Sequence, residues 1–178
     1  VLLLAAQSHG QTLVRLTFDE LRAADRGPLA VPFETGGYFG ARNVPILANT
    51  LGTQALIASV AAPPVALRVM TTSGRNFFTT VAIPGEPEPA FGVIFRFATP
   101  VTQFSLWRCG IDLREGERVS HPAWSLYALD EAGVVIDSTE ELAFSTDARL
   151  DPRRFEVRGA SISRVMIAST PATGAMLA

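Results

Sequence analysis

Apolar and polar residues alternate in short runs along this chain, and turn-forming residues separate the runs. The alternation is clearest in residues 91–97, where every second side chain is a phenylalanine or a valine. Such a two-residue period is typical of a half-buried strand. Apart from residues 20–24, no segment shows sustained helical periodicity with caps. The pattern therefore predicts many short strands and very little helix.

The sharpest local signal lies between two apolar runs, residues 124–129 and 134–136. The residues between them begin with Asp130 and end with Gly133. Aspartate suits the first position of a tight turn, and glycine suits a position where φ becomes positive. We therefore predict an antiparallel hairpin with a positive φ at Gly133.

Many short strands without long helices are typical of a β-sandwich or a barrel. Hydrophobic residues make up 48% of the 178 residues and charged residues 18%. This balance excludes a disordered chain and allows one domain with a sizeable core. The expected core consists of inward-facing apolar side chains of the central and last strands: Phe95, Phe97, Phe104, Leu106, Leu126, Phe155, Val157, Val165 and Ile167.

The two ends of the chain differ from its middle. Residues 1–11 begin with an apolar run that is typical either of the end of a signal peptide or of a first strand. We expect the domain to span residues 12–169, and residues 170–178 to form a linker or the start of a C-terminal sorting tail. These ends favour an exported protein, secreted or at the cell surface. The domain lacks the run of ~18 apolar residues that a membrane helix needs, so we expect it to be soluble.

Several short motifs occur in a characteristic order. Ile-Phe-Arg-Phe at 94–97 precedes the hairpin, and Phe-Glu-Val at 155–157 precedes the apolar run at 162–167. Thr-Phe-Asp-Glu at 17–20 and the Gly-Tyr-Phe-Gly loop at 37–40 belong to the same pattern. This order resembles the galactose-binding-like jelly-roll domains of exported bacterial proteins of the PEP-CTERM type. The resemblance covers residues 12–169 and implies an all-β, antiparallel jelly-roll β-sandwich.

The same resemblance implies that a structural calcium ion is possible between the first loop and the last strand. Asp19 and Glu20 would be its acidic ligands. Ser163 and Arg164 stand where such domains often have acids. Calcium needs about six to eight oxygen ligands, so backbone carbonyls would have to supply most of them. No other cofactor is expected.

The chain contains no G-x-S-x-G, H-E-x-x-H, P-loop or dinucleotide motif, and we expect no enzymatic activity. His9, His121 and Cys109 are its only histidines and its only cysteine, which makes a zinc site improbable. We expect His121 in a loop before a strand and Cys109 as a buried thiol. The net charge of −2 and the dispersed arginines argue against a nucleic-acid partner.

Aromatic residues outside the expected core are the candidates for ligand binding. Sugar rings present apolar C–H faces that stack on flat aromatic rings, while polar neighbours bind the hydroxyl groups. Tyr38 and Phe39 lie in the glycine-rich loop, where sandwiches often place ligand contacts. Trp107 faces outward from its strand, with Arg108 next to it. The alternative for Trp107 is a packing role under a loop or sheet.

These features favour a non-catalytic extracytoplasmic binding module for carbohydrate or a cell-surface polymer. One alternative is a structural or adhesive protein of the envelope or matrix, without a small ligand. Another is an accessory domain of a hydrolase. An open face with an exposed aromatic row would favour the first function, and a flat apolar patch would favour the second.

Overall fold

The computed structural model describes residues 2–6, 13–16, 43, 46–49, 53–59, 68–72, 76–82, 92–121, 123–169 and 176–177. Every regular element in these residues is a β-strand. All of the strand pairs between them are antiparallel. The prediction of an all-β, antiparallel fold is therefore confirmed.

The strands of the described segments, in chain order, are β1 (Leu2–Ala6), β2 (Leu13–Leu16), β3 (Ile46–Asn49), β4 (Thr53–Ser59), β5 (Val69–Met70), β6 (Asn76–Ala82), β7 (Gly92–Arg108), β8 (Gly110–Ile111), β9 (Val119–His121), β10 (Trp124–Leu129), β11 (Val135–Glu141), β12 (Phe144–Thr146), β13 (Arg153–Ser169) and β14 (Met176–Leu177).

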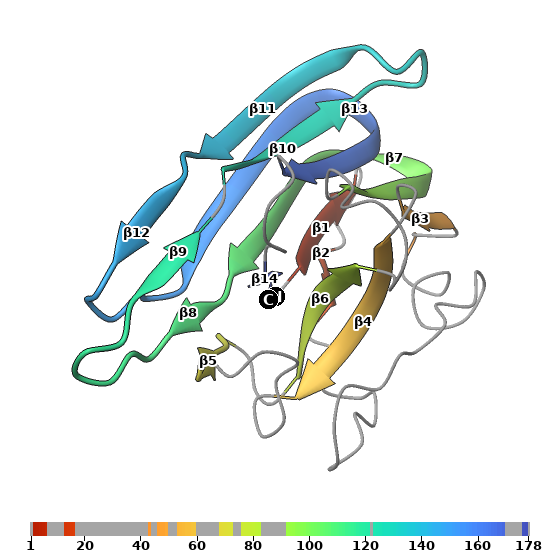
Figure 1. Ribbon diagram of the computed structural model, residues 1–178. Coiled ribbons are helices and arrows are strands. Elements are labelled where there is room, and N and C mark those ends of the chain that lie inside the picture. Colours follow the sequence, from red (N-terminus) through yellow and green to blue (C-terminus); the bar gives the residue numbers. More distant parts are fainter. Residues whose placement is uncertain are drawn as a thin grey trace.

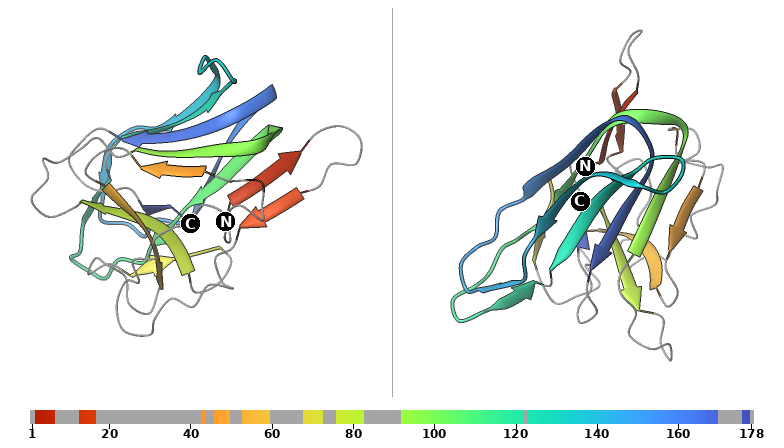
Figure 2. Two further views of the ribbon diagram at one scale, coloured as in Figure 1. Left: turned by 90° about the vertical axis from the view of Figure 1, so that its right-hand side faces the viewer. Right: turned by 90° about the horizontal axis from the view of Figure 1, so that it is seen from above.

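Most of these strands join one ten-stranded sheet in the order β11-β10-β13-β7-β14-β6-β4. The short strands β3 and β1 also pair with β7, and β2 pairs with β1. Two small pairs, β12 with β9 and β5 with β8, lie at one end of the long strands (Figure 1). In the side view, β4 and β6 lie below β7 and β13 (Figure 2, left). The sheet therefore curves, and its inner face can enclose a core.

The long strands β7 and β13 each contain 17 residues and pair with each other along most of their length. Their register shifts between Arg158 and Ile162, and again between Ile162 and Arg164. Extra residues in one strand of an antiparallel pair bend that strand and increase its twist. The strands bend here, where β7 contains Pro100.

Two contacts at this bend depend on particular residues. A Cβ atom on Gly159 would lie only 2.5 Å from Cδ1 of Ile136 in β11, so glycine leaves room here for the end of the Ile136 side chain. On the β7 side, Asn43 adopts a positive φ of 68°. Its side-chain amide donates to the carbonyl of Thr99 and accepts from the Thr99 amide, both at 2.8 Å. Asparagine tolerates this left-handed conformation better than most residues.

The core lies on the inner face of the long strands. Its largest fully buried side chains include Trp124, Phe95 and Phe104, and the rings of Phe95 and Phe104 lie 5.7 Å apart. Cys109 is also buried, as predicted. Each core residue expected from the alternation is buried, namely Phe95, Phe97, Phe104, Leu106, Leu126, Phe155, Val157, Val165 and Ile167.

The predicted hairpin joins β10 to β11. Gly133 has a φ of 85°, and its amide donates to the carbonyl of Asp130 at 3.1 Å. The Asp130 carboxylate accepts from the amide of Val134 at 2.9 Å. The register shifts by one residue directly before the turn, between Ala128 and Leu129. A tight turn followed by a left-handed glycine in a bulge is a common hairpin connection.

Both ends of the chain contribute strands. β1 pairs with β7 and β2, and β14 pairs with β6 and β7. The described residues contain no helix that is long and apolar enough to cross a membrane.

Candidate functional site

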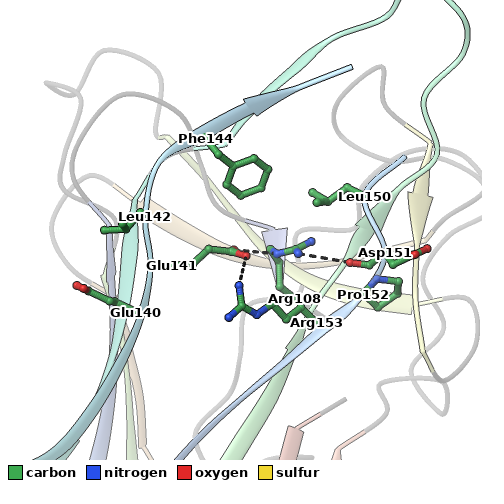
Figure 3. Close-up of a pocket in the computed structure, with 9 residues that line it drawn as sticks. All are labelled: Arg108, Glu140, Glu141, Leu142, Phe144, Leu150, Asp151, Pro152 and Arg153. Carbon is green, nitrogen blue, oxygen red and sulfur yellow. Dashed lines mark hydrogen bonds and ion pairs between the residues drawn. The ribbon is translucent and has the colours of Figure 1, made fainter. Parts of the chain in front are cut away.

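An open hollow of about 740 Å³ lies where β11 ends and β13 begins (Figure 3). It is formed by one residue of β7, the end of β11 with the segment leading into β12, and the segment that leads into β13. These lining residues are Arg108, Glu140, Glu141, Leu142, Phe144, Leu150, Asp151, Pro152 and Arg153.

The floor of the hollow is organised around the carboxylate of Glu141. This residue is only 6% exposed, because Glu141 is the direct partner of the buried Trp124 in the β10–β11 register. The indole Nε1 of Trp124 donates to Oε2 of Glu141 at 2.9 Å. The Nε atom of Arg108 lies 2.8 Å from the same oxygen. A buried carboxylate needs such partners because burial removes its water.

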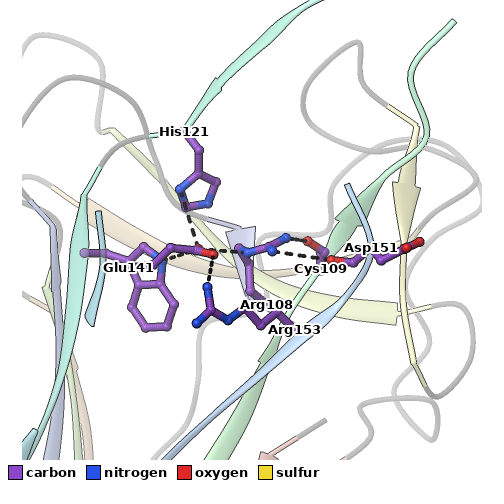
Figure 4. A network of polar contacts seen from close by, with 7 residues as sticks. Arg108, Cys109, His121, Glu141, Asp151 and Arg153 are labelled. Carbon is purple, nitrogen blue, oxygen red and sulfur yellow. Dashed lines mark hydrogen bonds and ion pairs between the residues drawn. The ribbon is translucent and has the colours of Figure 1, made fainter. Parts of the chain in front are cut away.

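Arg108 connects this carboxylate to two backbone segments (Figure 4). Its Nη1 donates to the carbonyl of Cys109 at 2.7 Å, and its Nη2 donates to the carbonyl of Asp151 at 3.4 Å. The side chain is 3% exposed. Its guanidinium is therefore already engaged on three sides, and it stabilises the floor of the hollow.

Arg153 is the accessible cation of the hollow. It is the direct strand partner of Arg108, and Glu141 lies between the two positive charges, with Oε1 at 3.7 Å from Nη1 of Arg153. The Arg153 side chain is 62% exposed, and its guanidinium carbon lies 4.9 Å from the centre of the Phe155 ring. This position leaves Arg153 free to meet a ligand from solvent.

The ring of Phe144 points into the hollow (Figure 3). It stacks on the imidazole of His121, with ring centres 5.2 Å apart and an angle of 3° between the planes. His121 itself is buried, and its Nδ1 lies 3.9 Å from Oε2 of Glu141. The histidine expected in a loop is thus the last residue of β9, where it supports an aromatic side of the hollow.

Burial raises the pKa of the Cys109 thiol from 9.0 to about 12, because the thiolate would lose its water. The thiol therefore stays protonated at neutral pH, whereas a cysteine nucleophile reacts as the thiolate. The described residues also contain no group of three or more histidine, cysteine, aspartate or glutamate side chains placed to hold a metal ion.

The site residues proposed from sequence have different positions. Tyr38, Phe39, Asp19 and Glu20 lie outside the described residues. Arg108 lines the hollow but is buried in the ion pair with Glu141.

Trp107 is half-buried and faces the opposite side of β7 from Arg108, because successive strand residues alternate between faces. Its direct strand partner is Arg154. The structure therefore does not bring Trp107 and Arg108 together.

Glu141, Phe144 and Arg153 were not expected from sequence to form a site. Each lies in a segment without a recognisable motif. The one available signal is the hairpin, because the pairing of β10 with β11 places Glu141 opposite Trp124. That pairing depends on the register shift before the turn, which the sequence does not reveal.

No known family model and no curated protein matches the chain. Among solved structures, the chain is similar to the enzymatically active domain of tailspike protein 4 of bacteriophage CBA120, with a TM-score of 0.35 and 15% identity. The match covers 83% of this chain and 20% of that one, so this chain spans a fifth of its length. A likeness of this extent defines neither the fold nor the function.

Proposed function

We propose that the chain is a non-catalytic binding module that takes carbohydrate, free or as part of a cell-surface polymer, in the hollow beside β11 and β13. One observation carries this proposal. An aromatic ring and an accessible guanidinium from different segments, those of Phe144 and Arg153, meet at the hollow, and the exposed residues Glu140 and Asp151 also line it.

The chemistry of the lining suits a sugar because a sugar is both apolar and polar. Its C–H face can contact Phe144, and its hydroxyl groups can donate to Asp151 and accept from Arg153. The volume of about 740 Å³ lies within the usual range for small-molecule sites. The stacking of Phe144 on His121 holds the ring in place before binding, which lowers the entropic cost of binding.

The state of the buried groups supports binding without catalysis. The carboxylate of Glu141 is occupied by Trp124 and Arg108, so it acts as a structural anchor. The raised pKa of Cys109 keeps its thiol protonated. The exposed lining side chains are well placed to bind hydroxyl groups by hydrogen bonds.

We also propose that the fold is a jelly-roll β-sandwich of the galactose-binding-like type, in an exported bacterial protein that is secreted or lies at the cell surface. The curvature that carries β4 and β6 beneath β7 and β13 supports a sandwich. The order of motifs in residues 94–167 supports the family.

A second candidate function, that of a structural or adhesive envelope protein, is favoured by β11. This strand is the last in the main sheet order. It and its flanking residues expose four large apolar side chains: Val134, Val135, Ile136 and Leu142. Exposed apolar side chains along a sheet edge favour association with another chain.

A glycan array followed by titration calorimetry tests the carbohydrate proposal. We expect the wild type to select a set of glycans, and Phe144→Ala and Arg153→Gln each to weaken binding about tenfold, as loss of a central contact does. Arg158→Gln is the matched control, because Arg158 is an exposed arginine of β13 that pairs with Glu156, and neither residue lines the hollow.

An array without any retained glycan would contradict the proposal, as would wild-type affinity in both hollow variants. Loss of binding in Trp107→Ala alone would move the site to the other face of β7. Concentration-dependent self-association without glycan binding would favour the adhesive alternative.

A further inference from the structure

The outer face of the main sheet carries a second pair of opposed arginines. Arg164 of β13 and Arg96 of β7 are direct partners in the antiparallel register. The neighbouring partners Val165 and Phe95 are fully buried. Because side chains alternate along a strand, Arg164 and Arg96 both point to the outer face of the sheet.

This pair differs from the pair of arginines at the hollow. Like charges directly opposite each other destabilise a sheet. At the hollow, Glu141 lies between Arg108 and Arg153 and offsets their repulsion. On the outer face, neither Arg96 nor Arg164 forms an ion pair with another described residue. Arg164 donates to the backbone carbonyl of Glu131 at 2.9 Å, and Arg96 is exposed.

Half-buried apolar side chains form the next row on the same face. Tyr127 of β10 is the direct partner of Met166, and Met166 is the direct partner of Ile94. All three are partly exposed. The two arginines thus border a surface that combines a phenol ring with aliphatic side chains, and this surface crosses three strands.

We propose that Arg96 and Arg164 bind an acidic sugar unit of an anionic polysaccharide. The planar guanidinium groups would bind a carboxylate, a geometry in which arginine forms paired hydrogen bonds. The row of Tyr127 and Met166 would contact the apolar face of the ring. The carboxylate would supply the negative charge that this pair lacks. This site lies apart from the hollow and goes beyond the carbohydrate site proposed there.

Affinity electrophoresis tests the proposal with three gel additives: polygalacturonate, dextran as a neutral polysaccharide, and poly-glutamate as an acidic polypeptide. We expect polygalacturonate alone to retard the wild type, and added salt to reduce the retardation. Arg96→Gln should weaken this binding about tenfold because a charge-assisted contact is lost. Arg158→Gln is the matched control, since Arg158 is an exposed arginine of β13 that already pairs with Glu156.

Thermal melting of Arg96→Gln should match or exceed that of the wild type, because the substitution removes a repulsion and no partner. Equal retardation of Arg96→Gln and the wild type would overturn the proposal, as would no retardation of the wild type. Equal retardation by poly-glutamate would also overturn it. Phe144→Ala should keep its affinity for polygalacturonate, and loss of that affinity would place the anionic ligand in the hollow.

Discussion

Replacing Glu141 with glutamine should strongly destabilise the fold. Glutamine keeps the size of the side chain and an oxygen that accepts from Trp124, but it removes the negative charge. Arg108, which is 3% exposed, would then remain charged without a counter-ion. Removing one partner of a buried ion pair costs about 3–5 kcal/mol. For a domain of this length, that cost corresponds to a fall of about 10 °C in melting temperature.

The matched variant for this experiment is Arg153→Gln. Arg153 also faces Glu141, but its side chain is 62% exposed and its Nη1 lies 3.7 Å from Oε1 of Glu141. An exposed pair contributes about 0–1 kcal/mol, so this variant should melt within a few degrees of the wild type. Urea unfolding followed by tryptophan fluorescence gives the free energy of unfolding of each variant.

The double variant Arg108→Met/Glu141→Gln separates a charge effect from a packing effect. It removes both charges and keeps the oxygen that accepts from Trp124, so it should recover much of the stability lost in Glu141→Gln. A free energy of unfolding for Glu141→Gln within about 1 kcal/mol of the wild type, a margin typical of an exposed pair, would refute a stabilising buried ion pair here. A double variant less stable than Glu141→Gln would refute it as well.

Three further predictions concern the turn, the buried thiol and calcium. Gly133→Val should lower the free energy of unfolding by about 1 kcal/mol or more, because a β-branched residue resists the φ of 85°, and Gly133→Asn should lower it less. Equal melting temperatures of Gly133→Val and the wild type would contradict this prediction. Above pH 9 the unfolded Cys109 thiol ionises while the folded one, with a pKa of about 12, stays protonated. The stability that this thiol contributes is therefore complete below pH 9 and falls by up to about 1.4 kcal/mol per pH unit as the pH rises toward 12. Between pH 8 and 11, the free energy of unfolding should fall less steeply with pH in Cys109→Ala than in the wild type. Parallel declines in the two proteins would contradict this prediction. If calcium binds at Asp19 and Glu20, a chelator should lower the melting temperature and Asp19→Asn should remove that effect; a wild-type curve indifferent to both chelator and calcium argues against the site.

The sequence predicted the core well because burial follows a local rule. Phe104 and Val157 each lie between two polar neighbours, and each is fully buried. The hairpin was predictable for a similar reason, since Asp130 and Gly133 have preferences that act over four residues. Both predictions needed only the neighbours of a residue along the chain.

The hollow was not predictable because its residues meet through register. Along β11 the apolar residues Val135 and Ile136 are exposed, while Glu141 at the far end is buried. The rule that apolar strand residues are buried and charged ones are exposed therefore fails for this strand. Because a charged strand residue is usually exposed, the sequence predicted Arg108 to be an exposed ligand-binding residue. Its partner Glu141 lies on another strand, brought close by the pairing of β7, β13, β10 and β11.

The absence of a side chain at Gly159 also has a consequence for the apolar edge of the sheet. The end of the Ile136 side chain lies where a Cβ atom on residue 159 would be, and Ile136 itself is 40% exposed. A larger residue at position 159 would displace this flexible side-chain end and turn more of it toward solvent, while the β11 backbone stays in place. Gly159 therefore shelters part of an apolar side chain that β11 would otherwise present to another chain.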